Sequence, residues 1–390
     1  MPQSPSPERV TERGTASAVE RGATALSVEG LTVTVGGGRS RAVREVSFSV
    51  ARGESVGLVG ESGSGKSLTC RSVLGVLPPG CEVAGGRVVL TGTAADGSAE
   101  GAGGTEGGIE LTALTRRQWD GVRGSRLGAV FQDPASYLNP SLTVGRQLAE
   151  QLRVTLRLSR AAAHARAVEL LTDVGLHHPE DVYHQYPHEL SGGMLQRVLI
   201  AIAISCDPEL LIADEATTAL DVVVQAEILE LLHRLRTEHG LALLLVTHDL
   251  AVVAEVCDRI LVMYAGEIVE DGPTADVLAA PSHPYTEALL RVASLGTWGR
   301  RELDVIPGRP PEAGAELPGC RFADRCAYAT AACTAAPVPL HTAGDGHRSR
   351  CLRVAEAGSG SGSGSGSGAG SGSGSAETSR AAAYKEGATV

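Results

Sequence analysis

One eight-residue motif constrains the fold more than any other feature of the sequence. Residues 60–67 read GESGSGKS and fit the pattern G-x-x-x-x-G-K-[S/T], between an apolar run at 55–59 and a helix-like stretch at 66–76. A glycine-rich turn of this kind points backbone N–H groups at an anion, and the helix N-terminus adds its positive dipole end. Lys66 is expected to reach the β- and γ-phosphates of a nucleotide, and Ser67 to ligate Mg²⁺. The predicted phosphate loop consists of Gly60, Glu61, Ser62, Gly63, Ser64, Gly65, Lys66 and Ser67.

Polar residues follow other apolar runs, as a nucleotide site at strand ends requires. The run LLIA ends in Asp214 and Glu215. Asp214 suits the Mg²⁺ shell, and Glu215 suits the general base that orients the attacking water. Gln132 follows a short apolar pair, where it could ligate Mg²⁺ or position water. His248 follows the run LLLVT, where it could contact the γ-phosphate. Each of these two is also consistent with an ordinary loop residue, and it is their order along the chain that gives them weight.

Apolar segments elsewhere predict a fold that alternates strands and helices. Strand-like segments lie at 31–35, 46–50, 55–59, 87–90, 109–111, 210–213 and 241–246. The first two alternate apolar and polar residues, whereas the last two are apolar throughout, which is typical of strands buried on both faces of a parallel sheet. Helical spacing runs from about 142 to 176. This order predicts an α/β fold with a parallel central sheet. Beyond residue 280, repeated prolines are expected to interrupt any long element.

The charge and the aromatic content disfavour nucleic acid as a partner. The 390 residues include 34 Lys and Arg against 45 Asp and Glu, a net charge of −11, with 2 Trp, 7 Tyr and 3 Phe. Nucleic-acid binders typically present basic surfaces, and single-strand binders add aromatic side chains for base stacking. The sequence has no run of eighteen apolar residues, and its N-terminus lacks the apolar core of a secretory signal. We therefore expect a cytosolic protein, in which disulfide bonds are rare.

The sequence LSGGMLQR at 190–197 predicts a second anion site. Ser191, Gly192 and Gly193 open a predicted helix, whose first N–H groups and dipole favour an anion. Because the chain carries no second phosphate nearby, this helix start is expected to face a nucleotide that another subunit holds.

The same LSGGM resembles the signature motif of ABC ATPases, and other motifs of that family occur in the family's order over residues 26–272. They are the phosphate loop, Gln132 of the Q-loop, the signature with Ser191, Gly192 and Gly193, the Walker B pair Asp214 and Glu215, the D-loop at 219–221 with Asp221, and the switch His248. The resemblance implies a P-loop ATPase fold with a RecA-like core, an antiparallel β subdomain and a helical subdomain at about 137–195. It also implies ATP and Mg²⁺ as cofactors, with Mg²⁺ near Ser67, Gln132 and Asp214. Two such subunits would form a head-to-tail dimer that sandwiches two ATP molecules.

Further motifs resemble one branch of this family, the oligopeptide, dipeptide and nickel importer ATPases. They are QDP at 132–134, LNP at 138–140, Met194, HPYTEALL at 283–290 and a C-terminal cysteine segment. The branch implies a subunit at the cytoplasmic face of the plasma membrane, paired with a second ATPase, most simply as a heterodimer. Two transmembrane permeases and an extracytoplasmic substrate-binding protein complete such importers. Peptide import is the favoured function, and nickel import, an exporter ATPase and a soluble non-transport ABC ATPase are the alternatives.

The cysteines fall into two groups. Cys70, Cys81, Cys206 and Cys257 are scattered and are most simply core or spare thiols, whereas Cys320, Cys326, Cys333 and Cys351 gather in one segment. Four thiolates suit Zn²⁺ or an iron–sulfur cluster, and the spacing by itself decides neither. In some members of the branch this segment binds a [4Fe–4S] cluster, so the resemblance favours the cluster, with Zn²⁺ and unligated cysteines as alternatives.

The composition divides the chain into five parts. They are a disordered lead (1–25), the ATPase domain (26–280), a C-terminal extension with the four cysteines (281–357), a Gly/Ser linker (358–375) and a tail (376–390). The sequence departs from the family at two places. Val35 stands where the family usually stacks an aromatic residue on adenine, and Ala216 stands where a proline usually follows the Walker B pair.

Overall fold

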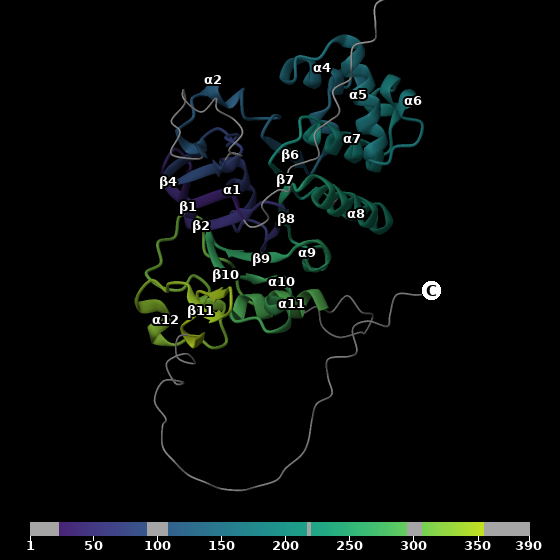
Figure 1. The fold of residues 1–390 in the computed structure, drawn as a ribbon. Coiled ribbons are helices and arrows are strands. Elements are labelled where there is room, and N and C mark those ends of the chain that lie inside the picture. The colour runs from purple at the N-terminus through teal and green to yellow at the C-terminus, as the bar shows by residue number, and fades with distance from the viewer. Residues whose placement is uncertain (1–22, 92–107, 217–219, 295–305, 355–390) are drawn as a thin grey trace, which may run out of the picture.

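The computed structural model describes residues 23–91, 108–216, 220–294 and 306–354. Most of the expected lead (1–25), the Gly/Ser linker (358–375), the tail (376–390) and Ala219 of the D-loop lie outside these ranges. Two sheets organise the described chain (Figure 1). The smaller sheet is antiparallel in the order β2-β1-β4-β5, and its strands are β1 (Thr24–Val35), β2 (Ser40–Ala51), β4 (Glu82–Thr91) and β5 (Gly108–Glu110).

The larger sheet has eight strands in the order β11-β12-β10-β9-β3-β8-β7-β6. Its parallel part consists of β6 (Leu127–Phe131), β7 (Leu210–Asp214), β8 (Ala242–Thr247), β3 (Ser55–Val59) and β9 (Arg259–Tyr264). Its antiparallel edge consists of β10 (Glu267–Pro273), β12 (His347–Ser349) and β11 (His341–Gly344). Every residue of β3, β7 and β8 is buried, which confirms the prediction of a parallel sheet covered on both faces.

Helices form two groups, one beside the large sheet and one that extends from it (Figure 1). The first group is α1 (Lys66–Val73), α7 (Gly192–Ile204), α8 (Val222–His239), α9 (Leu250–Val256), α10 (Thr274–Ala279) and α11 (Pro284–Ser294). The second group is α3 (Pro134–Tyr137), α4 (Val144–Thr155), α5 (Arg160–Asp173) and α6 (Pro179–His184). Two short helices lie elsewhere, α2 (Arg116–Trp119) and α12 (Ala331–Ala335). No helix within the described ranges has the length and apolar character that a membrane span needs.

The helical stretch expected at 142–176 is two helices, α4 and α5. Arg157 adopts a left-handed backbone conformation (φ 55°) that ends the first helix. Ser159 then caps the second, because its Oγ accepts a hydrogen bond from the Ala162 N–H at 3.3 Å. Periodicity alone therefore gave the correct element type but missed the break between them.

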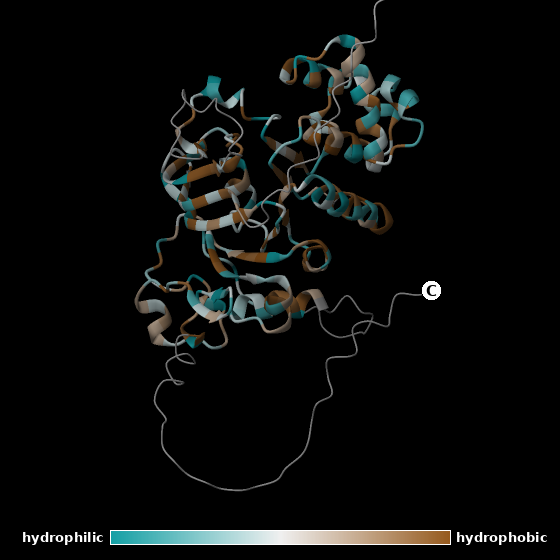
Figure 2. Ribbon diagram, viewed as in Figure 1, coloured by the Kyte–Doolittle hydropathy of each residue, from teal (hydrophilic) through white to brown (hydrophobic). Residues whose placement is uncertain are grey.

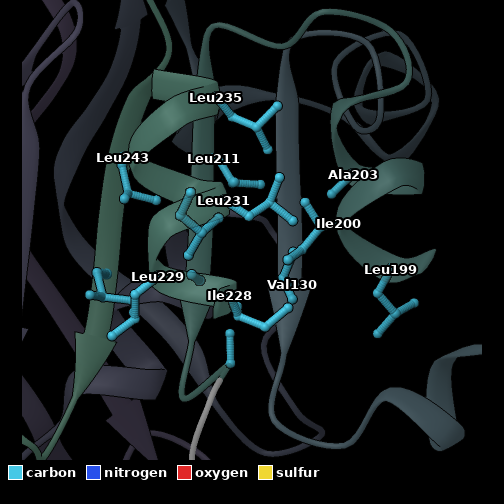
Figure 3. Close-up of a cluster of buried hydrophobic side chains, with 14 of the residues drawn as sticks. Val130, Leu199, Ile200, Ala203, Leu211, Ile228, Leu229, Leu231, Leu235 and Leu243 are labelled. Carbon is cyan, nitrogen blue, oxygen red and sulfur yellow. The ribbon is translucent and has the colours of Figure 1, made fainter. Parts of the chain in front are cut away.

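Alternate residues of the buried strands enter two hydrophobic cores on opposite faces of the large sheet. In β7, Leu211 faces the core formed with the helices, whereas Leu210 and Ile212 face the core formed with the small sheet. Figure 3 shows the first core, where Ile200 of α7 and Leu231 of α8 point toward the strands. Figure 2 shows hydrophobic residues concentrated on strands, while α8 carries both hydrophobic and hydrophilic residues. This two-sided packing fixes the strand ends on which the site is built.

The C-terminal segment, residues 306–354, is joined to the large sheet by strand pairing. Strand β12 pairs with β10 through Glu270 opposite Ser349 and Asp271 opposite Arg348. The expectation that prolines beyond 280 prevent any long element is wrong for α11, which has eleven residues. Pro284 is its first residue, where the missing N–H costs the helix nothing.

Candidate active site

The register of the parallel strands brings the predicted residues to one edge of the large sheet. Phe131 of β6 lies opposite Asp214 of β7, and Asp214 lies opposite Val246 of β8. Thr247 of β8 in turn lies opposite Val59 of β3. The residues that follow these strand ends are Gln132, Glu215, His248 and Gly60. The carboxyl ends of parallel strands are where α/β sheets bind ligands.

Two glycines give the phosphate loop its shape. Gly60 has φ 153°, and a Cβ there would lie 2.1 Å from the carbonyl oxygen of Met263. Gly65 has φ 108°, a conformation that favours glycine. Ser62 and Gly63 are exposed between them, and Ser64 is buried. The loop therefore lies tightly against β9 and leaves only its outer turn open to a ligand.

Lys66 is the buried cation of the loop, with 5% of its surface exposed. Its Nζ donates hydrogen bonds to the carbonyl oxygens of Gly60 at 2.7 Å and Glu61 at 3.0 Å. Burial lowers the pKa of Lys66, while the nearby carboxylates of Glu215 and Asp214 oppose that shift. The ammonium group thus lies across the loop, at the position from which it can meet phosphate oxygens.

Ser67 and Asp214 form the oxygen pair expected for Mg²⁺. The Ser67 Oγ donates a hydrogen bond to Asp214 Oδ1 at 3.0 Å. Burial raises the pKa of Asp214, and the hydrogen bond from Ser67 opposes the rise. A buried carboxylate beside a hydroxyl is a suitable partial shell for Mg²⁺, which takes oxygen ligands and keeps several waters.

Glu215 and His248 also lie close together, with 3.8 Å between Glu215 Oε1 and His248 Nδ1. Glu215 has a left-handed backbone (φ 52°), and its N–H donates to the carbonyl oxygen of Val246 at 2.9 Å. This hydrogen bond to β8 therefore fixes the backbone position from which the Glu215 side chain extends. Gln132 is exposed at the end of β6, next to the Asp214 strand.

The predicted signature forms the start of α7 and not part of the phosphate loop. Ser191 caps this helix by accepting a hydrogen bond from the Met194 N–H at 3.3 Å. Asp221 caps the adjacent α8, and Gly193 allows the two helix starts to approach, since a Cβ there would lie 2.7 Å from Val224 Cγ1. Within the described residues, no hydrogen bond or ion pair joins Ser191, Gly192 or Gly193 to the loop. The signature residues thus form a capped helix start of their own, beside the start of α8.

Val35 and Ala216, the two departures from the family pattern, lie in regular backbone or buried positions. Val35 is the last residue of β1, where it pairs with Ser40 across the turn to β2. Ala216 is buried directly after Glu215. Neither position changes the carboxylates at the sheet edge.

The four clustered cysteines line one cavity of the C-terminal segment, which we call the four-thiol site. Its sulfur-bearing residues are Cys320, Cys326, Cys333 and Cys351. Burial, followed by the charge of the neighbouring thiols, raises the pKa of Cys320 to about 11. Burial also raises the pKa of Cys326 and Cys351. In each of these three, the backbone N–H two residues further along the chain opposes the rise. Burial and the neighbouring thiols disfavour the thiolate form, which a bound cationic group would favour.

The four thiols form a candidate ligand set for a metal ion or a metal cluster. Tetrahedral zinc with Zn–S bonds of about 2.3 Å requires sulfur atoms about 3.8 Å apart. Among the described residues, one trio of His, Cys, Asp or Glu has its ligand atoms all within 4.8 Å, and it is His164, Glu180 and His184 in the helical group. No three of the four thiols meet this 4.8 Å limit, and backbone N–H groups lie near three of the sulfurs.

Two residues that contact the phosphate loop were missed in the sequence. The Glu61 N–H donates to Tyr285 Oη at 2.8 Å, and the Arg325 guanidinium pairs with the Glu61 carboxylate at 2.8 and 3.1 Å. The signal for Tyr285 was its place in HPYTEALL, and that for Arg325 was its place beside Cys326. Neither motif indicates which residue the side chain contacts.

Comparison with known proteins agrees with this geometry. The ABC transporter family matches residues 43–218, and the oligopeptide/dipeptide transporter C-terminal region matches residues 269–333. A probable peptide ABC transporter ATP-binding protein of Sinorhizobium fredii is 44% identical over 81% of this chain and 90% of its own. The dipeptide transport ATP-binding protein DppD of Bacillus subtilis is 41% identical over 84% of this chain and 93% of its own.

Solved structures give the same class. The cassette cbiO1 of Clostridium perfringens, part of an ABC transporter complex, has a TM-score of 0.55 and 28% identity, covering 66% of this chain and 92% of its own. A dimeric ATP-binding cassette bound to ADP and Pi has a TM-score of 0.54 and 27% identity, covering 64% of this chain and 98% of its own. The chain is therefore an ATP-hydrolysing cassette with the ABC nucleotide-binding fold. It belongs to the ABC transporter family, and its C-terminal region matches that of the oligopeptide/dipeptide transporters.

Proposed function

We propose that this chain is the ATPase subunit of an importer for dipeptides or oligopeptides, located at the cytoplasmic face of the plasma membrane. The observation that carries the proposal is the extent of its likeness to peptide-import ATP-binding proteins. A putative peptide import ATP-binding protein of Brucella abortus is 46% identical over 85% of this chain and 97% of its own. The match thus includes both the sheet edge and the C-terminal segment.

In this proposal the residues at the sheet edge have different roles in ATP binding and hydrolysis. The phosphate loop and Lys66 hold the phosphates of ATP, and Ser67, Asp214 and Gln132 hold Mg²⁺. Mg²⁺ supplies positive charge that neutralises the phosphate oxygens during transfer. Glu215 accepts a proton from the attacking water, and His248, 3.8 Å from the Glu215 carboxylate, orients that side chain toward the γ-phosphate.

The second group of residues serves the partner's nucleotide. Ser191, Gly192 and Gly193 offer N–H groups at the start of α7, apart from this chain's own loop. Asp221 caps α8 beside them. We propose a head-to-tail pairing with a second ATPase subunit of different sequence, docked on two membrane permeases that receive peptide from a substrate-binding protein.

We further propose that residues 281–357 form an extension to the ATPase domain (26–280), whose helical subdomain spans about 137–195. The extension binds a [4Fe–4S] cluster through Cys320, Cys326, Cys333 and Cys351. The open spacing of the thiols and the N–H groups near the sulfurs support a cluster over zinc. The cluster holds together a segment that has little hydrophobic core of its own.

The test of this function uses the whole assembly in lipid, with the companion ATPase, the permeases and the binding protein. Peptide-loaded binding protein is expected to stimulate ATP hydrolysis, and Glu215→Gln is expected to lower the stimulated rate by ~10²–10⁴-fold. Stimulation by nickel and not by peptides, or equal hydrolysis without the permeases, would contradict peptide import. Iron, sulfide and zinc analysis of the purified chain tests the cluster separately.

A further inference from the structure

Arg325 of the C-terminal segment has its charged group almost fully enclosed, with 4% of the side chain exposed. Its Nη1 and Nη2 donate to both oxygens of Glu61 at 2.8 and 3.1 Å. The same nitrogens donate to Tyr264 Oη at 3.2 Å and to the Ile306 carbonyl oxygen at 3.0 Å. The Nε donates to the Pro307 carbonyl oxygen at 2.9 Å. A guanidinium has five N–H groups, and all five are used here.

Glu61 connects this arginine with the cation of the phosphate loop. Its backbone N–H donates to the buried Tyr285, whose ring packs against Tyr264 and Phe322 with centroids 4.6 and 5.4 Å away. Its carbonyl oxygen accepts a hydrogen bond from Lys66 Nζ. The first turn of the loop is thus held on one side by the C-terminal part of the chain, and on the other by the lysine that meets phosphate.

Arg325 also stands between two cysteines of the four-thiol site. It ends the short 3₁₀ turn Ala323–Arg325. The Ala323 N–H donates to the Cys320 carbonyl oxygen at 3.1 Å, and the Cys326 N–H donates to the Ala323 carbonyl oxygen at 3.2 Å. A group bound by both thiols would fix both ends of this turn, and with them the direction of the guanidinium.

We propose that Arg325 is a positioning residue for the phosphate loop, through which the state of the four-thiol site sets the affinity for ATP. The role toward the loop stands on the contacts above, whereas the link to the thiols rests on the proposed function, in which they bind a metal group. Because such coupling is reciprocal, ATP must also stabilise the group bound by the thiols.

The first test measures the Kd of a fluorescent ATP analogue for the full-length chain. Arg325→Gln is expected to weaken binding about tenfold, within the usual range of site-to-site coupling. Arg325→Lys is expected to bind the ATP analogue weakly as well, because an ammonium group has three N–H donors and cannot replace the five hydrogen bonds of the planar guanidinium. Arg291→Gln is the matched control, since Arg291 pairs with Glu287 on the exposed side of α11. An Arg325→Gln affinity within twofold of the unaltered chain would overturn the proposal.

A double variant separates positioning from simple neutralisation of charge. Arg325→Gln leaves the Glu61 carboxylate uncompensated, which itself repels phosphate and destabilises the fold. Arg325→Gln with Glu61→Gln removes both charges, so its melting temperature is expected to recover while nucleotide binding stays weak. Recovery of full affinity in the double variant would show that Arg325 only neutralises Glu61, and positioning would be refuted.

The link to the four-thiol site is tested by the release of its metal. The rate at which a chelator removes iron from the purified chain is expected to fall several-fold with ATP. The same nucleotide is expected to have no effect on release in Arg325→Gln at saturating ATP. Equal release with and without ATP in the unaltered chain would overturn the link. A purified chain without iron or zinc would overturn both the link and the proposed cofactor, while the affinity test of Arg325 would still stand.

Discussion

The phosphate loop and the four-thiol site are built in opposite ways within one chain. The loop connects β3 to α1, and its neighbours at the sheet edge are held by strand register and by two hydrophobic cores. The four-thiol site lies in a segment with few regular elements, held by polar contacts, one short strand pairing with β10 and a few apolar side chains such as Phe322. The arginine between Cys320 and Cys326 then joins the two regions at Glu61.

The two regions therefore hold their functional residues in place in different ways. The sheet edge is supported by close packing, because every residue of its central strands is buried. The C-terminal segment depends on what its thiols hold and on single buried groups such as Glu270. That carboxylate accepts hydrogen bonds from the Ser282 and His283 N–H groups and contacts His347 Nε2 at 2.7 Å. Variants in the first region should change chemistry, and those in the second should change stability and affinity.

Glu215→Gln should give the largest effect of any single change. Loss of the general base is expected to slow hydrolysis by ~10²–10⁴-fold while ATP still binds. Phosphate release in the reconstituted transporter and nucleotide Kd of the chain measure the two quantities. Glu255→Gln, an exposed carboxylate on α9, is the control. Near-normal turnover in Glu215→Gln would remove this residue from the mechanism.

Asp214→Asn should separate activity from stability at the sheet edge. Loss of the carboxylate is expected to weaken Mg²⁺ binding and slow hydrolysis by about 10²-fold, as loss of one charge-stabilising group does elsewhere. Because burial raises the pKa of Asp214, its ionised form destabilises the nucleotide-free fold as pH rises through that pKa. The variant should therefore melt about 2–4 °C higher at neutral pH, the shift for about 1 kcal/mol. A lower melting temperature in calorimetry would contradict the cost assigned to this buried charge.

Cys326→Ser should damage the C-terminal segment and leave the sheet edge folded. The proposed metal group is lost, so protease cleavage within 306–354 is expected to accelerate, while nucleotide binding weakens about tenfold at most. Mass spectrometry of a limited digest locates the cuts. Cys81→Ser, outside the four-thiol site, is the matched control. Equal digestion of the two variants would mean that the thiols do not hold the segment.

His283→Asn should produce the smallest effect, confined to acid. Burial lowers the pKa of His283 to about 3, from an ordinary value of 6.5. Below pH 6.5 this histidine is therefore protonated in the unfolded chain but stays neutral in the folded chain. The free energy of unfolding then falls by up to about 1.4 kcal/mol per pH unit as the pH drops. Asn preserves an acceptor for the Tyr285 N–H, which donates to His283 Nδ1 at 3.1 Å. Melting temperatures from pH 7 to 5 should fall less steeply in the variant, and parallel curves would contradict the assignment.

The sequence predicted the sheet edge well because its signals are local. The run at 55–59 coincides with β3, and Asp214 ends β7 as expected. Strand patterns, glycines and strand-end carboxylates each depend on neighbours within a few residues, and the rules for parallel sheets place those ends together. The roles of Gln132, His248 and the signature residues remain predictions.

The rest could not be predicted, because it depends on pairs that are distant in sequence. Glu61 and Arg325 are 264 residues apart, and nothing near either one identifies the other. The pairing of β12 with β10 is likewise set by a short, polar strand without a clear alternating pattern. Four cysteines indicated a ligand set, but the surroundings of each thiol depend on how the intervening chain folds.

The pairing of β12 with β10 has a consequence for any shortened form of this protein. Truncation before β12 would expose the backbone N–H and C=O groups of β10 that now pair with Ser349 and Arg348. It would also remove His347, leaving the buried Glu270 with one partner fewer. An uncovered edge strand promotes aggregation by pairing with other chains. The C-terminal segment therefore also covers the edge of β10, and an isolated cassette would leave that edge open to pairing with other chains.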